Sequence, residues 1–259
     1  MGEYEGYLAA AMDVVREAGG ILRKNVRETG EIFFKGAVNL VTKSDTESQE
    51  LIFRRLSSLF PGHDFLAEEG LAALSGAEFR WVFDPLDGTT NFAHKFPVFC
   101  VSLGLEHRGR LVCGVVFDPM RDEMFWGERG GGAFQNGERI RVSTVNDLDK
   151  SLLATGFSYD IRETKTNISQ FNRFLLRSQG VRRCGSAALD LCYVACGRLE
   201  GFWEMKLSPW DTAAGALIVE EAGGRVSDFG GRPVNIYHPE VVASNRLVHQ
   251  TMLDILNLP

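Results

Sequence analysis

The sequence lacks the features of membrane-spanning, secreted and nucleic-acid-binding proteins. No apolar run approaches the length that spans a bilayer. The first residues, Met1–Glu5, have neither the basic nor the apolar region of a signal peptide. The net charge of −6 disfavours partners whose binding depends on neutralising phosphates along a nucleic acid. We therefore expect a cytoplasmic protein that binds neither membrane nor nucleic acid.

Cysteine is scarce and unpatterned. The chain has five cysteines and no Cys-x-x-Cys pair. An odd number without paired spacing predicts neither a disulfide framework nor a zinc site. The five residues are typical of small buried apolar groups in a reducing compartment: Cys100, Cys113, Cys184, Cys192 and Cys196.

What the chain does contain is an ordinary globular composition. It has 259 residues, of which 44% are hydrophobic and 24% charged, enough for a large core. Strands and turns alternate over 98–142, and strands and helices alternate after about residue 146. We predict one domain over 1–259, with an antiparallel-rich lobe at 1–145 and an α/β lobe at 146–259.

Periodicity and turn residues predict the elements individually. Helices are expected at 4–28, 44–60, 164–178, 186–197, 209–222 and 247–256. Strands are expected at 31–34, 65–70, 81–84, 98–106, 111–118, 123–126, 140–142, 151–157, 181–184, 202–204, 225–229 and 241–243. Ser44 and Glu47 form a predicted capping box, Lys35-Gly36 a turn, and 71–80 a loop.

The stretch Asp84-Pro85-Leu86-Asp87-Gly88-Thr89-Thr90-Asn91 combines groups for a cation and for an anion. We expect Pro85 to end a buried strand and a turn to bring Asp87 back beside Asp84. Gly88 permits close approach of a ligand, and the following amides point outward at a helix start. Carboxylates and free amides would then lie within one turn of each other. The same residues also suit an ordinary turn, so the stretch alone leaves both interpretations open.

Other acids have structural explanations as well. Asp45 can favour a helix dipole, Glu68-Glu69 can be solvated loop acids, and Asp211 can cap a helix with Ser208. However, Asp84 and Asp211 follow aromatic residues, and clustered carboxylates in apolar surroundings repel one another unless a cation holds them. No His or Cys accompanies them, which favours a hard cation with oxygen ligands, Mg²⁺.

Four motifs resemble those of the inositol monophosphatase family. Asp84–Asn91 resembles its first signature and Trp210-Asp211-Thr212-Ala213-Ala214-Gly215 its second. Glu68-Glu69 lies the family's usual distance upstream, although Gly70 replaces a serine, and Leu40–Asp45 resembles its N-terminal segment. The resemblance covers essentially the whole chain. It implies an α/β (α+β) fold of the α-β-α-β-α layered sandwich type shared with fructose-1,6-bisphosphatase, a homodimer and inhibition by lithium.

The resemblance also implies a role for each motif residue. Two or three Mg²⁺ ions are expected, one held by Glu68, Asp84 and the backbone carbonyl of Leu86. Asp84, Asp87 and Asp211 would hold a second, and a third would contact Glu68 through waters. The Gly88 and Thr89 amides would bind phosphate, while the Thr89 hydroxyl, paired with Asp45, would orient and deprotonate the attacking water.

For the alcohol part of the substrate, the resemblance implies a separate set of residues. Glu204 would bind ring hydroxyls, and Gly185-Ser186-Ala187 would lie along the alcohol. Asp87 and Asp211 would also face the substrate. Arg183 has two open interpretations, a substrate contact or a structural ion pair.

The predicted activity is Mg²⁺-dependent hydrolysis of a polyol phosphomonoester, foremost myo-inositol 1-phosphate, by water activated at the metal site. The first alternative is fructose-1,6-bisphosphatase, or a dual activity. Positive residues that could receive a second phosphate are Arg162, Lys165, Arg173, Arg177, Arg182 and Arg183. A lower alternative is a non-catalytic role in which the same scaffold binds a macromolecular partner.

Overall fold

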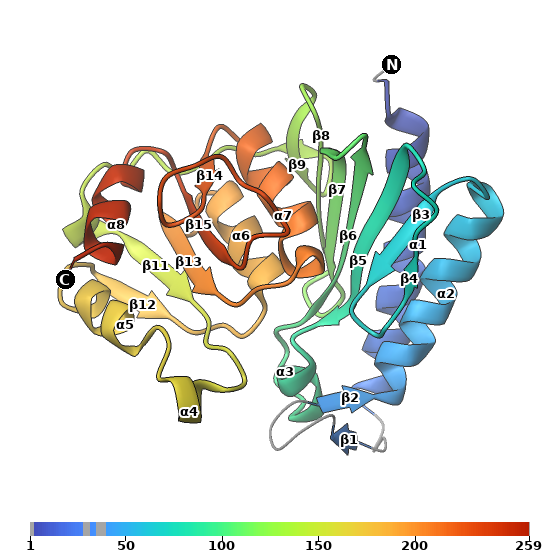
Figure 1. Ribbon diagram of the computed structural model, residues 1–259, viewed down its shortest axis with the longest axis horizontal. Coiled ribbons are helices and arrows are strands. Elements are labelled where there is room, and N and C mark those ends of the chain that lie inside the picture. Colours follow the sequence, from blue (N-terminus) through green and yellow to red (C-terminus); the bar gives the residue numbers. More distant parts are fainter. Residues whose placement is uncertain (1–2, 28–31, 35–39, 259) are drawn as a thin grey trace.

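Five layers of helix and sheet make up the protein. The computed structural model describes residues 3–27, 32–34 and 40–258. In Figure 1, α1 (Glu5–Asn25) and α2 (Lys43–Leu59) cover one sheet, and α6 (Ala187–Ala195) and α7 (Pro209–Glu221) lie between the two sheets. The outer layer is formed by α5 (Ile168–Leu175) and α8 (His249–Leu256). The α-β-α-β-α sandwich expected from the motifs is thus confirmed.

The first sheet has eight strands in the order β10-β9-β8-β7-β6-β5-β3-β4. Only the β3–β5 pair is parallel. The bounds are β3 Asp64–Ala67, β4 Ala72–Ala73, β5 Phe79–Asp87, β6 Cys100–His107, β7 Arg110–Asp118, β8 Glu123–Glu128, β9 Gly132–Gln135 and β10 Glu138–Arg139. β4 forms inside the predicted loop 71–80. The strand predicted at 140–142 is wrong, because Asn136 and Gly137 turn the chain early, with φ of 50° and 88°, so that 138–139 pairs instead.

The second sheet has five strands in the order β12-β11-β13-β15-β14. β11 (Leu152–Thr155) runs parallel to β12 (Gly180–Arg182) and to β13 (Gly201–Met205). β15 (Glu240–Ser244) is antiparallel to β13 and to β14 (Arg225–Ser227). The two sheets use segments on either side of residue 145, and the division into two lobes stays a prediction. A short 3-10 turn, Leu148–Lys150, precedes β11.

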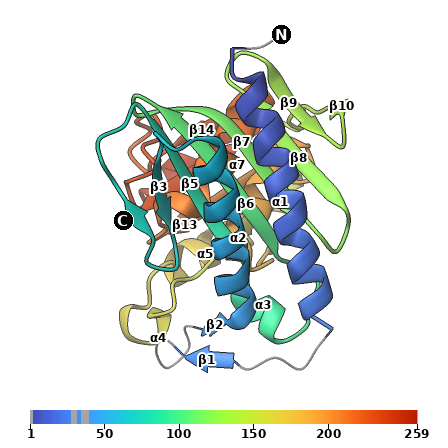
Figure 2. The same cartoon turned by 90° about the vertical axis from the view of Figure 1, so that its right-hand side faces the viewer.

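Three apolar cores separate the layers. The central core joins both sheets to α6 and α7, a second lies between the first sheet and α1 and α2, and a third lies under α5 and α8. Figure 2 shows α1 and α2 side by side across the first sheet. Successive side chains of β5 point to opposite faces of the sheet. Val82 therefore packs in the central core, and Phe83 packs in the core under α1 and α2. No helix in the described ranges is long and apolar enough to span a membrane.

Small residues let α7 approach the first sheet closely. A Cβ added at Gly104 would lie 2.8 Å from the Ala213 Cβ, and one at Gly114 would lie 2.7 Å from the Ala214 carbonyl oxygen. Both contacts are shorter than any normal Cβ contact, so the first turns of α7 rest directly on strand backbone. This contact fixes the position of Asp211 at the start of the helix.

The N-terminus of α2 differs from the prediction. Thr42, not Ser44, is the N-cap, and Asp45, not Glu47, completes the capping box. Glu47 instead accepts a hydrogen bond from Asn25 Nδ2 at 2.9 Å. The short strands β1 (Ile32–Phe34) and β2 (Leu40–Thr42) pair just before this helix. The predicted turn at Lys35-Gly36 lies outside the described residues.

A loop over 157–166 leaves the second sheet and returns to it at Asn167. The helix predicted at 164–178 is therefore two helices, α4 (Ile161–Thr164) and α5, because Lys165 and Asn167 have left-handed φ of 52° and 69°. The buried Asn167 amide donates to Thr155 Oγ1 and to the Gly156 carbonyl, both at 2.8 Å. Its oxygen accepts from Trp203 Nε1 at 2.6 Å. We call this set of bonds the Asn167 clamp.

Candidate active site

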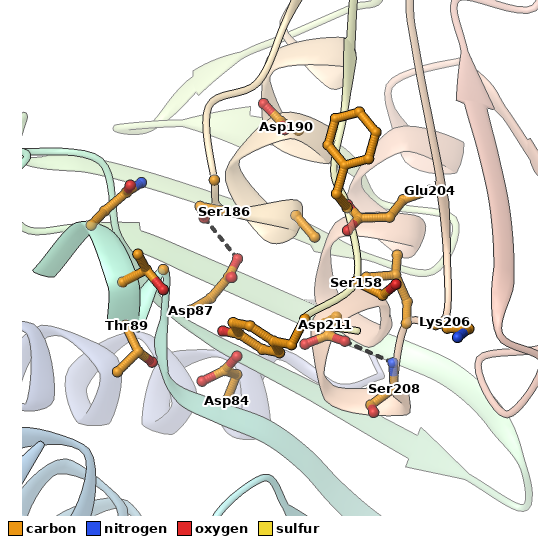
Figure 3. Close-up of a pocket in the computed structure, with 18 of the residues that line it drawn as sticks. Asp84, Asp87, Thr89, Ser158, Ser186, Asp190, Glu204, Lys206, Ser208 and Asp211 are labelled. Atoms are coloured by element: carbon orange, nitrogen blue, oxygen red, sulfur yellow. Dashed lines mark hydrogen bonds between the residues drawn. The ribbon is translucent and has the colours of Figure 1, made fainter. Parts of the chain in front are cut away.

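A cavity of about 810 Å³ collects nearly all of the predicted site residues. The C-terminal ends of β5 and β13, the helices α3 (Thr89–Ala93), α6 and α7, and the 157–166 loop contribute to its walls. Figure 3 shows Asp84 and Asp87 of β5 converging on it with Asp211 of α7. The predicted residues that line it are Glu68, Asp84, Leu86, Asp87, Gly88, Thr89, Arg183, Gly185, Ser186, Ala187, Glu204 and Asp211. Asp45 lies behind this lining.

The first motif is a bulge in a strand, not a turn after one. The expectation that Pro85 ends the strand is wrong, because β5 continues to Asp87 with a register shift between Asp84 and Asp87. Pro85 lies in the bulge and takes no part in the hydrogen-bond ladder of the sheet. Its carbonyl instead accepts a hydrogen bond from Ser48 Oγ at 2.9 Å. Both aspartates therefore reach the same cavity.

Gly88 follows the bulge in a conformation that suits glycine alone. Its φ is 98°, and a Cβ would lie 2.9 Å from the Val98 carbonyl oxygen and 3.2 Å from the Phe99 Cα. The residue also serves as the N-cap of α3. The backbone can therefore turn sharply from Asp87 into the helix start at the cavity wall.

Each of the three aspartates is held by one oxygen. Asp84 Oδ1 accepts from the Leu86 amide at 2.9 Å, and Asp211 Oδ2 from the Ser208 amide at 2.7 Å. Asp87 Oδ2 accepts from Ser186 Oγ at 2.7 Å and from the Ala188 amide at 2.8 Å (Figure 3). The second oxygen of each accepts no hydrogen bond from the described residues. These oxygens remain available to a ligand.

The carboxylates raise one another's affinity for protons. Burial raises the pKa of Asp84 well above its ordinary range, and the charges of Glu68, Asp87 and Asp211 raise it further. Burial and the charge of Asp87 likewise raise the pKa of Asp211. Burial also raises the pKa of Asp87, against its hydrogen bonds. A cation among these groups would relieve their repulsion.

The donor set fits a hard divalent ion. Within the part of the chain that the structure describes, no three His, Cys, Asp or Glu side chains are grouped as a ready metal-binding set. Mg²⁺ does not require such a cage, because it usually takes one or two carboxylates and completes its shell with waters and substrate phosphate. Unengaged oxygens on three aspartates, without His or Cys in the cavity lining, match that preference.

Asp45 is connected to the cavity through Thr89. Thr89 Oγ1 lies 3.2 Å from Asp45 Oδ1 and 3.1 Å from the Leu86 carbonyl oxygen. The other oxygen of Asp45 accepts from the Thr42 amide at 2.7 Å and from Thr42 Oγ1 at 2.6 Å. Burial raises the pKa of Asp45 to about 6. The residue thus completes the helix cap and also holds the Thr89 hydroxyl.

The segment before α6 forms a second wall. Asn91 Nδ2 donates to the Val98 carbonyl at 2.7 Å and to the Cys184 carbonyl at 2.8 Å, which ties this segment to the first motif. A Cβ at Gly185 would lie 2.8 Å from the Asn91 side chain. Arg183 is exposed and has no salt bridge to any described residue. The structural ion pair considered for it is therefore not present among those residues.

Glu204 lies at the end of β13. It is buried, and burial raises its pKa well above the ordinary range, although Arg183 opposes the rise. A Cβ at Gly156 would lie 2.1 Å from both Glu204 carboxylate oxygens. Only glycine at 156 leaves room for this carboxylate beside the cavity.

Several residues of the cavity wall escaped the sequence prediction. Tyr159 belongs to the 157–166 loop, and burial, together with the charges of Glu68, Asp87 and Asp84, raises its pKa. Lys206, which follows β13, forms an ion pair with Asp160 of the same loop. Asp190 lies on α6, and burial raises its pKa to about 8. Of these three residues, only Asp190 has a feature in the sequence that could have pointed to it, because it is the lone acid in the apolar helix 187–195.

Comparisons with known proteins identify relatives of the chain. A profile of the inositol monophosphatase family matches residues 3–257. Inositol monophosphatase 1 of Solanum lycopersicum is 43% identical over 264 aligned residues, covering 99% of this chain and 97% of the relative. A Salmonella typhimurium protein named Nus factor SuhB is 42% identical, covering 95% of this chain and 94% of its own.

The solved structure of inositol monophosphatase from Anabaena (Nostoc) sp. PCC 7120 has the same fold. It superposes with a TM-score of 0.91 at 40% identity, covering 100% of this chain and 98% of that one. Sequence and structure therefore agree along the full length of the protein. The chain belongs to the inositol monophosphatase family, whose members hydrolyse phosphomonoesters.

Proposed function

We propose that the protein hydrolyses a polyol phosphomonoester, foremost myo-inositol 1-phosphate, with the help of two or three Mg²⁺ ions. The observation that carries the proposal is the meeting of Glu68, Asp84, Asp87 and Asp211, from three separate segments, beside the Gly88 turn in one cavity. Full-length similarity to proteins named inositol monophosphatase supports the choice of substrate.

The metal ligands are those that the motifs imply. Glu68, Asp84 and the Leu86 carbonyl would hold one ion, and the unengaged oxygens of Asp84, Asp87 and Asp211 a second. A further ion would contact Glu68 through waters. When bound, such ions supply an acidified water, neutralise phosphate charge and stabilise the leaving oxygen.

Thr89 and Asp45 would manage the proton of the attacking water. The Thr89 hydroxyl carries one hydrogen, and both Asp45 Oδ1 and the Leu86 carbonyl lie within reach of it. When it donates to Asp45, its oxygen is free to accept a hydrogen bond from the attacking water. As the proton of the water moves to the Thr89 oxygen, the hydroxyl's own proton would pass to Asp45. Asp45 cannot turn away, because two bonds from Thr42 hold its other oxygen. The pair would thus aim the water at phosphorus.

The remaining wall would hold the substrate. The Gly88 and Thr89 amides would bind the phosphate, and Gly185, Ser186 and Ala187 would lie along the alcohol. Glu204 would accept hydrogen bonds from ring hydroxyls. The unpaired Arg183 supports its substrate-facing interpretation over the structural one.

Phosphate release from myo-inositol 1-phosphate tests the proposal. We expect release that requires Mg²⁺, is inhibited by lithium and falls at least 100-fold in Asp87→Asn. The control is Asp149→Asn, which removes an exposed acid outside the cavity and leaves the rate unchanged. Full activity after chelation of metal would overturn the proposal.

Fructose-1,6-bisphosphatase is the second candidate. Of the six positive residues expected to receive another phosphate, Arg162 and Arg183 line the cavity. Lys165, Arg173, Arg177 and Arg182 are not part of its lining, and Arg173 instead donates to the Leu258 carbonyl at 2.8 Å. The ratio of kcat/KM for inositol 1-phosphate and fructose 1,6-bisphosphate decides between the two substrates.

A partner-binding role is the lower candidate, and the similarity to a protein named Nus factor favours it. A partner-binding role requires no metal site. Pull-downs with the wild-type protein and with Asp87→Asn should therefore capture the same macromolecule. We also propose a homodimer, which light scattering of the purified protein tests directly. Capture that disappears with the metal site would argue against an independent binding role.

A further inference from the structure

Asp190 is a cavity-lining acid that the proposed catalytic apparatus does not use. It lies on α6, where its side chain is 1% exposed. The other buried residues of this helix are apolar and belong to the central core. A carboxyl group in such surroundings loses its hydration, so its presence there calls for a partner.

The described residues provide no complete partner. Asp190 Oδ1 is buried and has no hydrogen bond among them. The Cys184 thiol is within hydrogen-bonding reach of the Asp190 side chain, but it leaves the Oδ1 atom without a donor. A buried oxygen without a partner is unfavourable for folding and is rare in native proteins. A ligand that enters the cavity can supply the missing donor.

The position of Asp190 indicates which part of the ligand it meets. Figure 3 places it beyond Ser186 on the side that also carries Glu204, away from Asp84 and Thr89. Asp190 and Glu204 both line the cavity, and the charge of Asp190 acts on Glu204 as that of Asp87 acts on Asp190. In the proposed function, the Gly88 and Thr89 amides bind the phosphate. Asp190 therefore faces the alcohol.

We propose that Asp190 is a specificity-determining residue that binds a hydroxyl of the substrate alcohol alongside Glu204. The inference rests on the proposed function and assigns the preference for a polyhydroxylated alcohol to a pair of acids. A hydroxyl can both donate to a carboxyl group and accept from one, so the pairing needs no particular protonation state. An alcohol without that hydroxyl would leave Asp190 unpaired in the complex, which is how such a site rejects it.

The test compares two substrates. We would measure kcat and KM of wild type, Asp190→Leu and Asp190→Ala with myo-inositol 1-phosphate and with p-nitrophenyl phosphate, which has no alcohol hydroxyls. The ratio of the two kcat/KM values should fall about 10- to 100-fold in both variants, as expected when a buried substrate hydroxyl loses its hydrogen-bond partner. The fall should come mainly from KM. The ratio should stay constant in the control Asp149→Asn.

Thermal unfolding separates this role from a structural one. Asp190→Leu removes a buried unpaired carboxyl, so its Tm should equal or exceed that of wild type; Asp190→Ala covers the case in which leucine is too large. The inference would be overturned if the ratio of the two kcat/KM values stayed constant. This holds whether the activity on both substrates falls equally or does not fall at all. If the wild-type protein cleaves p-nitrophenyl phosphate but not inositol 1-phosphate, the proposed function is wrong, and this inference is wrong with it.

Discussion

Asp211 uses its two carboxylate oxygens for different purposes. One completes the capping box with Ser208 at the start of α7, and the other is left for the cavity. Asp45 has a similar double use, between Thr42 and Thr89. The capping role that the sequence offers for Asp211 is confirmed, and it is compatible with the proposed metal role, because the cap leaves the other carboxylate oxygen unbound by the described residues.

The Thr89 hydroxyl gives a prediction at the scale of one residue. Thr89→Val keeps the volume but removes the group that would accept the proton of water. We expect kcat to fall about 100- to 10,000-fold, with KM changed little. Thr89→Ser, which keeps the hydroxyl, should remain within about tenfold of wild type. Steady-state kinetics measure both, and an active valine variant would remove Thr89 from the mechanism.

The residues that escaped sequence analysis did so for physical reasons. The motif residues are close in sequence to one another or to a recognisable helix start, and the structure brings all but Asp45 to the cavity wall. Tyr159 reaches the wall only through the path of an irregular loop, which no periodicity encodes. Asp190 carried a signal, a lone acid in an apolar helix, but its orientation depends on how α6 packs.

At the scale of elements, the contact between α7 and the first sheet determines where Asp211 lies. A methyl group at Gly114 would lie 2.7 Å from the Ala214 carbonyl oxygen. Gly114→Ala should therefore displace α7, destabilise the protein by about 1–3 kcal/mol and lower kcat/KM at least tenfold. Urea unfolding and phosphate release measure the two effects.

Gly20 of α1 is the matched control for that substitution. It is exposed, and nothing lies within 4 Å of an added Cβ. Gly20→Ala should stabilise the helix by about 0.5–1 kcal/mol without changing activity. If both glycine variants were equally stable and active, close packing of α7 would not be what holds Asp211.

His249 links β14 to β15 and makes their stability depend on pH. Its ring nitrogens lie 2.9 Å from Ser227 Oγ and 2.8 Å from Ser244 Oγ. Burial, with a smaller effect of the charge of Arg225, lowers the pKa of His249 to about 4. In the unfolded chain this histidine binds its proton near pH 6.5, whereas in the folded protein it does so only near pH 4. Between pH 6.5 and 4 the unfolded state therefore holds more protons than the folded state. Stability should fall through that window as pH falls, by about 3 kcal/mol in total.

Denaturant unfolding as a function of pH measures the effect. His249→Gln should flatten the dependence in that window, whereas His94→Gln, at an exposed histidine, should leave it unchanged. Identical profiles for wild type and His249→Gln would show that another group is responsible.

Two of the wrong predictions have a similar cause. β5 passes through Pro85 because a bulge takes the proline out of the ladder, and the helix expected at 164–178 breaks because the Asn167 side chain is bound to the sheet. Both outcomes depend on residues far away in the chain, which local periodicity does not contain. The regular helices and hairpins, set by local patterns, were predicted to within a few residues at most ends.

At the scale of the whole molecule, the carboxylates of the cavity come from both sheets and from the helix between them. Mg²⁺ bound there should stabilise the entire fold, by about 2.7 kcal/mol at one hundred times its dissociation constant. Chelation should reverse the gain. Asp211→Asn should show a smaller gain and Asp149→Asn the full one, as measured by Tm against Mg²⁺ concentration. Equal gains in all three proteins would place the ion elsewhere.

The Asn167 clamp closes the 157–166 loop at its base by hydrogen bonds to β11 and β13. Changes of length or sequence beyond the clamp therefore need not propagate into the second sheet. The loop nevertheless contributes Tyr159 and Arg162 to the cavity wall. A change in the loop can therefore alter this part of the cavity wall while the carboxylates of β5 and α7 keep their positions.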